Sequence, residues 1–111
     1  MKKLRIYVCG PITDTDESIV KNNIETARKI GEKILKLGHL PYVPHTHFNG
    51  WNLDMFVAYD LFQAHGEDMI EQWADAIFFI APSNGANLER EKAESLGLKI
   101  FTSLEELESL Q

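Results

Sequence analysis

Four apolar segments stand out along the chain as predicted β-strands. Residues 76–81 are apolar throughout, without polar alternation, which is typical of a central parallel strand buried on both faces. Residues 4–9 are rich in β-branched and aromatic side chains and end at a Gly-Pro pair. Shorter apolar segments at residues 40–43 and 99–101 are predicted as two further strands.

A long helix is predicted between the first two strands. Its N-cap is expected among residues 14–16 and its end at Gly38. One face of this helix is apolar and carries Val20, Ile24, Ala27, Gly31 and Ile34. At the other end of the chain, Ser103 and Glu106 form a capping box for a helix that follows the last strand.

Two more helices are predicted on either side of the 76–81 strand. Residues 66–74 carry a helical pattern before it, after an irregular segment at residues 45–65 that has only a weaker pattern from residue 53 to residue 64. After the strand, a helix is expected to begin at Ala86 and to end at Gly97.

The alternation of strands and helices predicts an α/β sandwich of three layers. Each strand-helix-strand unit makes parallel neighbours with a right-handed crossover. We expect a four- or five-stranded parallel sheet in the order 2-1-3-4, with helices on both faces, in a single domain that spans residues 1–111. In that order the first strand lies beside the 76–81 strand, and the segments that follow these two strands face each other across one crevice.

Composition narrows the expected partners and location. The chain has 111 residues, is 44% hydrophobic and carries a formal net charge of -6. Because no cluster of Lys and Arg occurs, a nucleic-acid polymer is not expected as a partner. No apolar run approaches membrane-spanning length, so we expect a cytoplasmic protein without membrane association. The single cysteine, Cys9, lies in an apolar segment and is predicted to be a small buried hydrophobe.

The predicted crevice places an acid beside an anion site. Glu89 lies on the same helical stripe as Ala86 and Ala93, in the expected first turn, and is our candidate for the reacting group. Ser83 and Gly85, just before that helix, offer a hydroxyl and backbone amides to an anion. An acid in a first turn also complements the helix dipole, so a purely structural role for Glu89 stays open.

The irregular segment is predicted to form a wall or a lid of the pocket. Its aromatic residues Phe48 and Trp51 are suited to stacking on a flat base, and a core position for Trp51 stays equally open. His45 and His47 lie two residues apart with no third ligand at a usual spacing, so no metal site is predicted.

Together these residues resemble the nucleoside 2-deoxyribosyltransferase superfamily, which includes the 2′-deoxynucleoside 5′-phosphate N-hydrolases. The resemblance covers nearly the whole chain. It rests on an acid-rich helix that ends in Asp75, on the 76–81 strand, and on two motifs, Ile6-Tyr7-Val8-Cys9-Gly10-Pro11-Ile12 and Ser83-x-Gly85-x-x-x-Glu89-x-x-x-Ala93.

The resemblance implies a flavodoxin-like fold and cleavage of the N-glycosidic bond of a (deoxy)nucleoside or its 5′-monophosphate. Glu89 would be the nucleophile that forms a covalent glycosyl intermediate, and Tyr7 would orient it. Asp68 would act near the leaving base, with Glu67 and Asp60 as alternatives. The substrate-binding residues that the resemblance implies are Gly10, Pro11, Ile12, Ser83, Gly85, Asn87 and His45.

The resemblance implies no cofactor and no metal, and its partners are a small nucleoside or nucleotide and further copies of the chain in a homodimer or larger oligomer. It leaves open whether the sugar passes to water or to another base. The need for a 5′-phosphate is also open, because residues 13–16 read Thr-Asp-Thr-Asp where the hydrolases carry a basic, glycine-rich segment. The competing hypothesis is a non-catalytic nucleotide-binding module of the same fold, in which Glu89 has no chemical task.

Overall fold

The structure, a computed structural model, describes residues 2–54 and 58–110, and within them the chain forms four strands and five helices. The strands are β1 (Arg5–Cys9), β2 (Leu40–Tyr42), β3 (Ala76–Phe79) and β4 (Lys99–Phe101). The helices are α1 (Glu17–Lys36), α2 (Pro44–His47), α3 (Tyr59–Gln72), α4 (Asn84–Ser95) and α5 (Leu104–Glu108).

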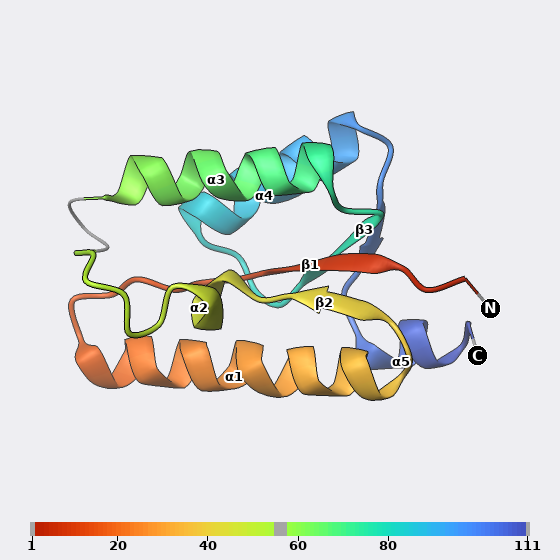
Figure 1. The fold of residues 1–111 in the computed structure, drawn as a ribbon, viewed down its shortest axis with the longest axis horizontal. Helices are drawn as coiled ribbons and strands as arrows, with labels where there is room; N and C mark the ends of the chain where they lie inside the picture. The colour runs from red at the N-terminus through yellow and green to blue at the C-terminus, as the bar shows by residue number, and fades with distance from the viewer. Residues whose placement is uncertain (1, 55–57, 111) are drawn as a thin grey trace.

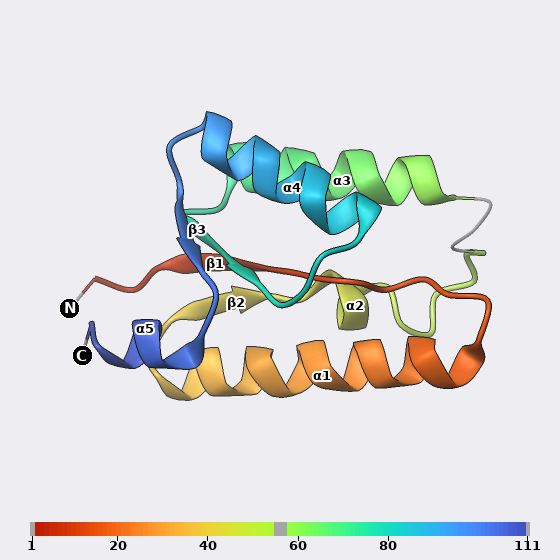
Figure 2. The same ribbon diagram turned by 180° about the vertical axis from the view of Figure 1, so that it is seen from behind.

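The sheet is parallel throughout and has the strand order β2-β1-β3-β4. The predicted order is confirmed, with four strands. Helices α1 and α5 cover one face of the sheet, and α3 and α4 cover the other (Figure 1, Figure 2). The result is a three-layer, flavodoxin-like α/β fold in which β1 and β3 occupy the centre.

The alternation of side chains along β1 divides the core in two. Ile6 and Val8 face α1 and α5, and their cluster also contains Ala27, Ile34, Ala76, Phe78, Phe101 and Leu107. Tyr7 and Cys9 face α3 and α4, where they pack with Ile70, Ala74, Ile77, Ala86 and Ala93. One strand thus contributes an entirely apolar pair to one layer and two titratable side chains to the other.

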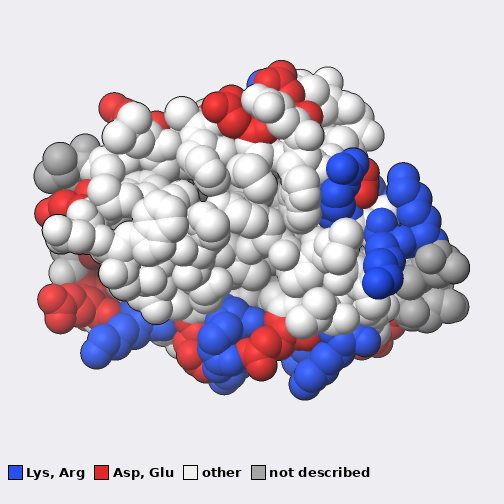
Figure 3. Space-filling view, in the orientation of Figure 1, with Lys and Arg blue, Asp and Glu red and all other residues white. Residues whose placement is uncertain are grey.

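Charged side chains are unevenly distributed on the face seen in Figure 3. Acidic side chains gather over α3, and charges of both signs lie along α1 (Figure 3). A broad uncharged area lies between them, over β2 and α2 (Figure 3).

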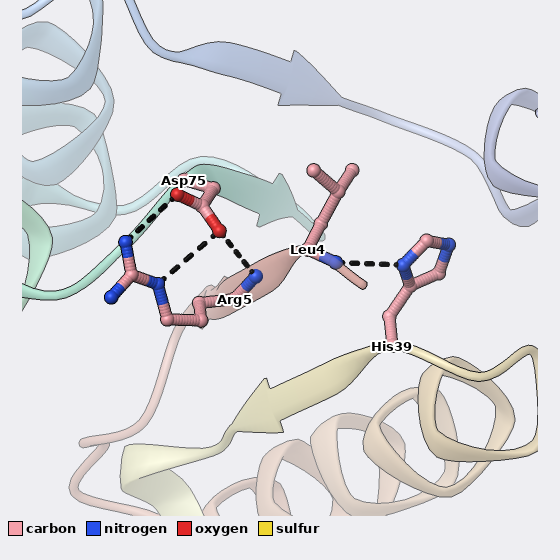
Figure 4. Close-up of polar contacts among 4 residues, drawn as sticks. All are labelled: Leu4, Arg5, His39 and Asp75. Atoms are coloured by element: carbon pink, nitrogen blue, oxygen red, sulfur yellow. Dashed lines mark hydrogen bonds and ion pairs between the residues drawn. The ribbon is translucent and has the colours of Figure 1, made fainter. Parts of the chain in front are cut away.

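Polar contacts of residues 4 and 5 fix the start of the central strand β1 (Figure 4). The backbone N–H of Arg5 donates to Oδ2 of Asp75 at 2.9 Å, and Nη2 of the same arginine lies 3.0 Å from Oδ1. The Arg5 side chain and backbone hold the pKa of Asp75 at about 2. The N–H of Leu4 donates to Nδ1 of His39 at 3.1 Å, so both neighbours of β1 are tied to its start.

The helices around the irregular segment differ from the prediction. The helix predicted at residues 66–74 is the second half of α3, which begins at Tyr59 and continues through Gly66. Part of the weaker pattern, at residues 55–57, lies outside the described residues. Pro44 begins the short helix α2, since the fixed φ of proline suits a first helical position.

Two boundaries near the third strand also move. β3 ends at Phe79, so residues 80 and 81 belong to the connection that follows it. α4 begins at Asn84 rather than at Ala86, because Ser83 serves as its N-cap. The last strand and the capping box of Ser103 and Glu106 are confirmed.

Candidate active site

Tyr7 and Glu89 meet on the α4 side of the sheet. The phenolic oxygen of Tyr7 donates a hydrogen bond of 2.6 Å to Oε2 of Glu89. Glu89 faces the sheet because it shares the buried side of α4 with Ala86 and Ala93, at the spacing of one helical face. Its side chain is buried, with only 9% of the residue exposed.

Glu89 lies in the second turn of α4. The helix begins two residues earlier than predicted, and its first turn holds no acidic residue, so the expected first-turn position of Glu89 is wrong. The stabilising effect of the helix dipole on an acid falls off within the first turn. The dipole therefore gives a weaker reason for a buried carboxylate here than the sequence suggested.

The second oxygen of the same carboxylate contacts a thiol. Sγ of Cys9 lies 3.4 Å from Oε1 of Glu89 and 3.4 Å from the carbonyl oxygen of Ala86. Cys9 is buried as predicted, but it is more than a small hydrophobe, because its S–H group faces two acceptors. Each oxygen of Glu89 thus has a donor on β1.

The surroundings of Glu89 act on its pKa in opposite directions. Burial raises the pKa of Glu89, and the negative charge of Glu67 raises it further. The hydrogen bonds from Tyr7 and Cys9 favour the ionised form and oppose part of this shift, but the net direction is upward. Burial and the neighbouring carboxylate also raise the pKa of Tyr7 well above its usual value, so the phenol keeps its proton.

Gly66 gives these two side chains the room to meet. A Cβ atom at position 66 would clash with both Oε2 of Glu89 and the hydroxyl oxygen of Tyr7. Glycine disfavours a helix interior by about 1 kcal/mol relative to alanine. Its presence in the middle of α3 is explained by this close approach, and not by a helix boundary.

A pocket of about 450 Å³ opens beside Glu89. Its walls come from the segments after β1 and β3, as the predicted crevice requires, and from the N-terminal half of α3. The lining residues are Tyr7, Gly10, Ile12, Thr13, Pro44, Phe48, Tyr59, Phe62, Gln63, Ser83, Asn84, Gly85, Ala86 and Glu89. Among these described lining residues Glu89 is the only Asp, Glu, Lys or Arg.

The N-terminus of α4 forms the wall opposite β1. The hydroxyl of Ser83 accepts a hydrogen bond of 3.1 Å from the N–H of Ala86, and it retains a proton that it can donate to a ligand. At Gly85 a Cβ atom would lie 2.6 Å from Oε1 of Gln63 and 2.9 Å from the hydroxyl of Tyr59. Glycine at this position therefore lets α3 and α4 come together at the pocket.

The loop after β1 contributes Gly10 and Ile12 to the pocket, and His45 supports the loop from behind. Nε2 of His45 lies 3.0 Å from the carbonyl oxygen of Pro11, so it carries the ring proton. Burial lowers the pKa of His45 to about 4. Pro11 and His45 were both predicted to bind substrate, and the structure places neither of them among the residues that line the pocket.

The three acids considered for the leaving base occupy different places on α3. Asp68, the residue chosen from the resemblance, is exposed and lies outside the pocket lining, as does Asp60. Glu67 is half-buried and accepts a hydrogen bond of 3.3 Å from Nε2 of Gln63, which does line the pocket. Asn87, predicted to bind substrate, is exposed on α4 and also lies outside the lining.

Three pocket residues on α3 were not predicted. Tyr59, Phe62 and Gln63 line the pocket, and Nε2 of Gln63 also donates to the carbonyl of Gly85 at 3.2 Å. With Gly66 they follow the i, i+3, i+4, i+7 spacing of one helical face. This spacing in the sequence could have identified them, but the helix was expected to begin only at residue 66, after three of the four positions.

Aromatic rings connect α2 to α3 beside the pocket. The ring centroid of Phe48 lies 4.8 Å from that of Phe62 and 4.9 Å from that of Trp51. Tyr42 stacks on Tyr7 at 5.6 Å, which adds a third aromatic contact next to the carboxylate. Within the irregular segment, which was predicted to form a wall or a lid, Phe48 lines the pocket together with Tyr59, Phe62 and Gln63, whereas Trp51 is half-exposed outside the lining.

Residues 2–54 and 58–110 contain no group of three or more His, Cys, Asp or Glu side chains that could hold a metal ion. Over the same residues, no helix combines the length and the apolar character needed to cross a membrane.

Comparison with known proteins gives a family for the chain. The model of the family described as "Domain of unknown function (DUF4406)" matches residues 4–102. The chain therefore belongs to this family. No curated protein matches the sequence.

Proposed function

We propose that this member of the DUF4406 family cleaves the N-glycosidic bond of a nucleoside or a nucleoside 5′-monophosphate, with Glu89 as the nucleophile. The observation that carries the proposal is the buried Glu89 carboxylate, held by Tyr7 on one oxygen and Cys9 on the other, at the wall of a pocket of about 450 Å³. Small-molecule pockets commonly have this size. The resemblance to the nucleoside 2-deoxyribosyltransferase superfamily supports the same reaction.

The chemistry follows from a fixed carboxylate and a sugar carbon. An oxygen of Glu89 bonds to C1′ as the bond from C1′ to the base nitrogen breaks, and the electron pair of that bond leaves with the base. The base takes a proton from an acid on α3. Water or a second base then attacks C1′, its proton returns to that acid, and Glu89 is released as a carboxylate.

Two groups on this chain prepare the first step. The hydrogen bond from Tyr7 fixes the carboxylate without an exchange of protons, because the pKa of Tyr7 is raised far above neutral pH by burial. Among the α3 acids, Glu67 is favoured over Asp68 for the proton transfer, since Glu67 is half-buried and bonded to the pocket residue Gln63, whereas Asp68 is exposed outside the lining.

The remaining pocket residues suit a flat base and a polar sugar. Phe48, Tyr59 and Phe62 offer ring faces and edges to a base, as aromatic side chains do in nucleotide sites. Ser83 and Gly85 lie at the N-terminus of α4, where a hydroxyl and backbone amides suit a 5′-hydroxyl or a phosphate.

We further propose that the chain forms a homodimer or larger oligomer through the face that carries α2 and the segment after it. That face is largely uncharged (Figure 3), and it exposes Trp51 by 53% and Leu53 by 49%. Sedimentation at working concentration tests this: Trp51→Ser should shift the protein toward the monomer, and a wild-type monomer would contradict it.

Base release from a panel of nucleosides and nucleotides, followed by chromatography, tests the proposed activity. We expect Glu89→Gln to lower turnover by at least about a thousandfold, because covalent catalysis is lost. Glu91→Gln, an exposed acid on the same helix, is the matched control and should retain activity. Equal turnover by both variants would contradict the role of Glu89, and ligand binding without any turnover by the wild type would favour the non-catalytic module.

A further inference from the structure

We propose that Cys9 is a positioning residue for Glu89, whose thiol proton goes to Oε1 when the carboxylate is charged and to the carbonyl of Ala86 when it is not. The inference rests on the proposed function for its kinetic consequence, but its structural content concerns two hydrogen bonds only. Cys9 forms and breaks no bond in the proposed reaction, and the inference assigns a role to its buried thiol.

The geometry offers the thiol two equal acceptors. Sγ lies 3.4 Å from Oε1 of Glu89 and 3.4 Å from the carbonyl oxygen of Ala86. An S–H group has one proton, so it donates to one of these oxygens at a time. Burial, followed by the charge of Glu89, raises the pKa of Cys9, so the thiol keeps that proton.

The charge of Glu89 decides between the two acceptors. A hydrogen bond to an ionised acceptor is roughly twice as strong as one between neutral groups. The charged carboxylate therefore draws the thiol proton to Oε1. When Glu89 is protonated, or esterified to a sugar, this advantage disappears, and the amide carbonyl of Ala86, a better acceptor than a neutral acid or ester oxygen, takes the proton.

A thiol suits this exchange better than a hydroxyl. It is a weak donor, so it orients Oε1 while leaving most of the negative charge available to the sugar carbon. Tyr7 supplies the strong bond on Oε2, at 2.6 Å. The carboxylate is thus held firmly through one oxygen and loosely through the other.

Other titratable and charged groups lie around Cys9 and Glu89 and act on their pKa values. Glu67 from α3 raises the pKa of Glu89, and Tyr7 from β1 lowers it through its hydrogen bond. Tyr42 from β2 responds to the charge of Glu89, and Arg90 from α4 acts on Cys9. Neither Tyr7 nor Tyr42 loses its proton near neutral pH, since the pKa of Tyr7 is raised well above its usual value and that of Tyr42 is raised to about 12.

Infrared spectroscopy can follow the thiol proton without any substrate. The chain contains one cysteine, so its S–H stretching band belongs to Cys9 alone. We expect the band to shift to higher frequency as acid protonates Glu89, because the hydrogen bond to a charged oxygen is lost. Glu89→Gln should abolish the pH dependence of the band, and Glu91→Gln should leave it in place.

Kinetics with two Cys9 variants provide a second test. Cys9→Ala removes a donor to the charged form, so the acid limb of the pH profile of kcat should move to higher pH, with kcat lower by about fivefold and KM little changed. Cys9→Ser supplies a stronger donor and should move that limb to lower pH. If Cys9 had a purely structural role, the acid limb would move in the same direction in both variants, or it would not move in either of them.

The two tests separate this inference from the proposed function. An S–H band that stays constant while Glu89 titrates would overturn the exchange of the thiol proton, whatever the enzyme does. A band that shifts as expected in a protein without turnover would uphold the contact between Cys9 and Glu89, and it would count against the proposed reaction alone.

Discussion

The hydroxyl of Tyr7 donates a hydrogen bond of 2.6 Å to Oε2 of Glu89, from a strand near the start of the chain to a helix 82 residues further on. The contact exists because β1 and β3 are neighbours and α4 follows β3, so α4 packs over β1. It joins a protonated phenol to a buried carboxylate at the wall of a pocket. The geometry of the candidate site depends on this pair.

Tyr7→Phe should therefore impair catalysis while leaving the fold intact. A hydrogen bond to a charged group contributes about 1.5–3 kcal/mol, so kcat should fall by about tenfold to a hundredfold. The acid limb of the pH profile should move to higher pH, because a donor that favours ionised Glu89 is lost. Tyr42→Phe is the control, since the buried Tyr42 hydroxyl has no hydrogen-bond partner among the described residues. A similar loss in both variants would show that the effect does not come from the hydrogen bond between Tyr7 and Glu89.

Gly66→Ala should disturb the same pair from the side of α3. The added methyl group would clash with Tyr7 and Glu89, and overpacking of this kind costs about 1–3 kcal/mol of stability. Alanine is otherwise the better helix former by about 1 kcal/mol, so helix propensity alone would predict that Gly66→Ala increases stability. Chemical denaturation combined with an activity assay measures both effects. A more stable and fully active Gly66→Ala variant would show that the approach of α3 to Glu89 is looser than described.

Substitution of Ser83 tests whether the N-terminus of α4 holds a phosphate. The hydroxyl also caps the helix, so Ser83→Ala should cost about 1 kcal/mol of stability, whereas Ser83→Gly should cost only a few tenths. With Ser83→Gly, calorimetry should show weaker binding of a nucleoside monophosphate, by about 1.5–3 kcal/mol, and a smaller loss for the matching nucleoside. Equal losses for the two ligands would mean that no phosphate is bound at Ser83.

The buried carboxylate should also lower stability at neutral pH. Because the pKa of Glu89 is raised in the folded protein, its contribution to stability is fully present below the unfolded pKa and is lost as pH rises through the folded pKa. Glu89→Gln does not titrate. The advantage of this variant over the wild type in unfolding free energy should therefore be larger at pH 8 than at pH 4. An advantage that stays constant or shrinks over this range would mean that the pKa of Glu89 is not raised.

The sheet could be predicted from the sequence because each strand carries its own signal. The continuous apolar run at residues 76–81 and the Gly-Pro end of the first strand placed β3 and β1, and a parallel sheet with helices on both faces favoured the order β2-β1-β3-β4, which the structure has. The position of Tyr7 near the end of the first strand and the helical period of α4 brought Tyr7 and Glu89 to one predicted crevice, whereas the role of Tyr7 came from the family resemblance. Helix boundaries were less certain, since Gly66 and Pro44 each have two interpretations in sequence.

The rest of the site depends on packing that one sequence does not reveal. The contact between Cys9 and Glu89 depends on how closely β1 and α4 approach each other, and the apolar sequence of the strand does not indicate that distance. Glu67 and Asp68 are adjacent on α3 and point in different directions from the helix. Which of them faces the site depends on the rotation of α3 about its axis, and residue type does not reveal this rotation. The support of the Pro11 loop by His45 joins residues 34 positions apart through a loop contact that no periodicity predicts.

Trapping of the glycosyl intermediate tests whether Glu89 is the nucleophile. A 2-fluoro sugar nucleoside slows both steps of such a reaction, so the ester should accumulate after mixing with the wild-type protein. Intact-protein mass spectrometry should show the added mass of one fluorinated sugar, and peptide mapping should place it on Glu89. The adduct should be absent from Glu89→Gln and present in Glu91→Gln. An adduct on Asp68 or Glu67, or base release from this substrate with no adduct at any residue, would contradict nucleophilic catalysis by Glu89.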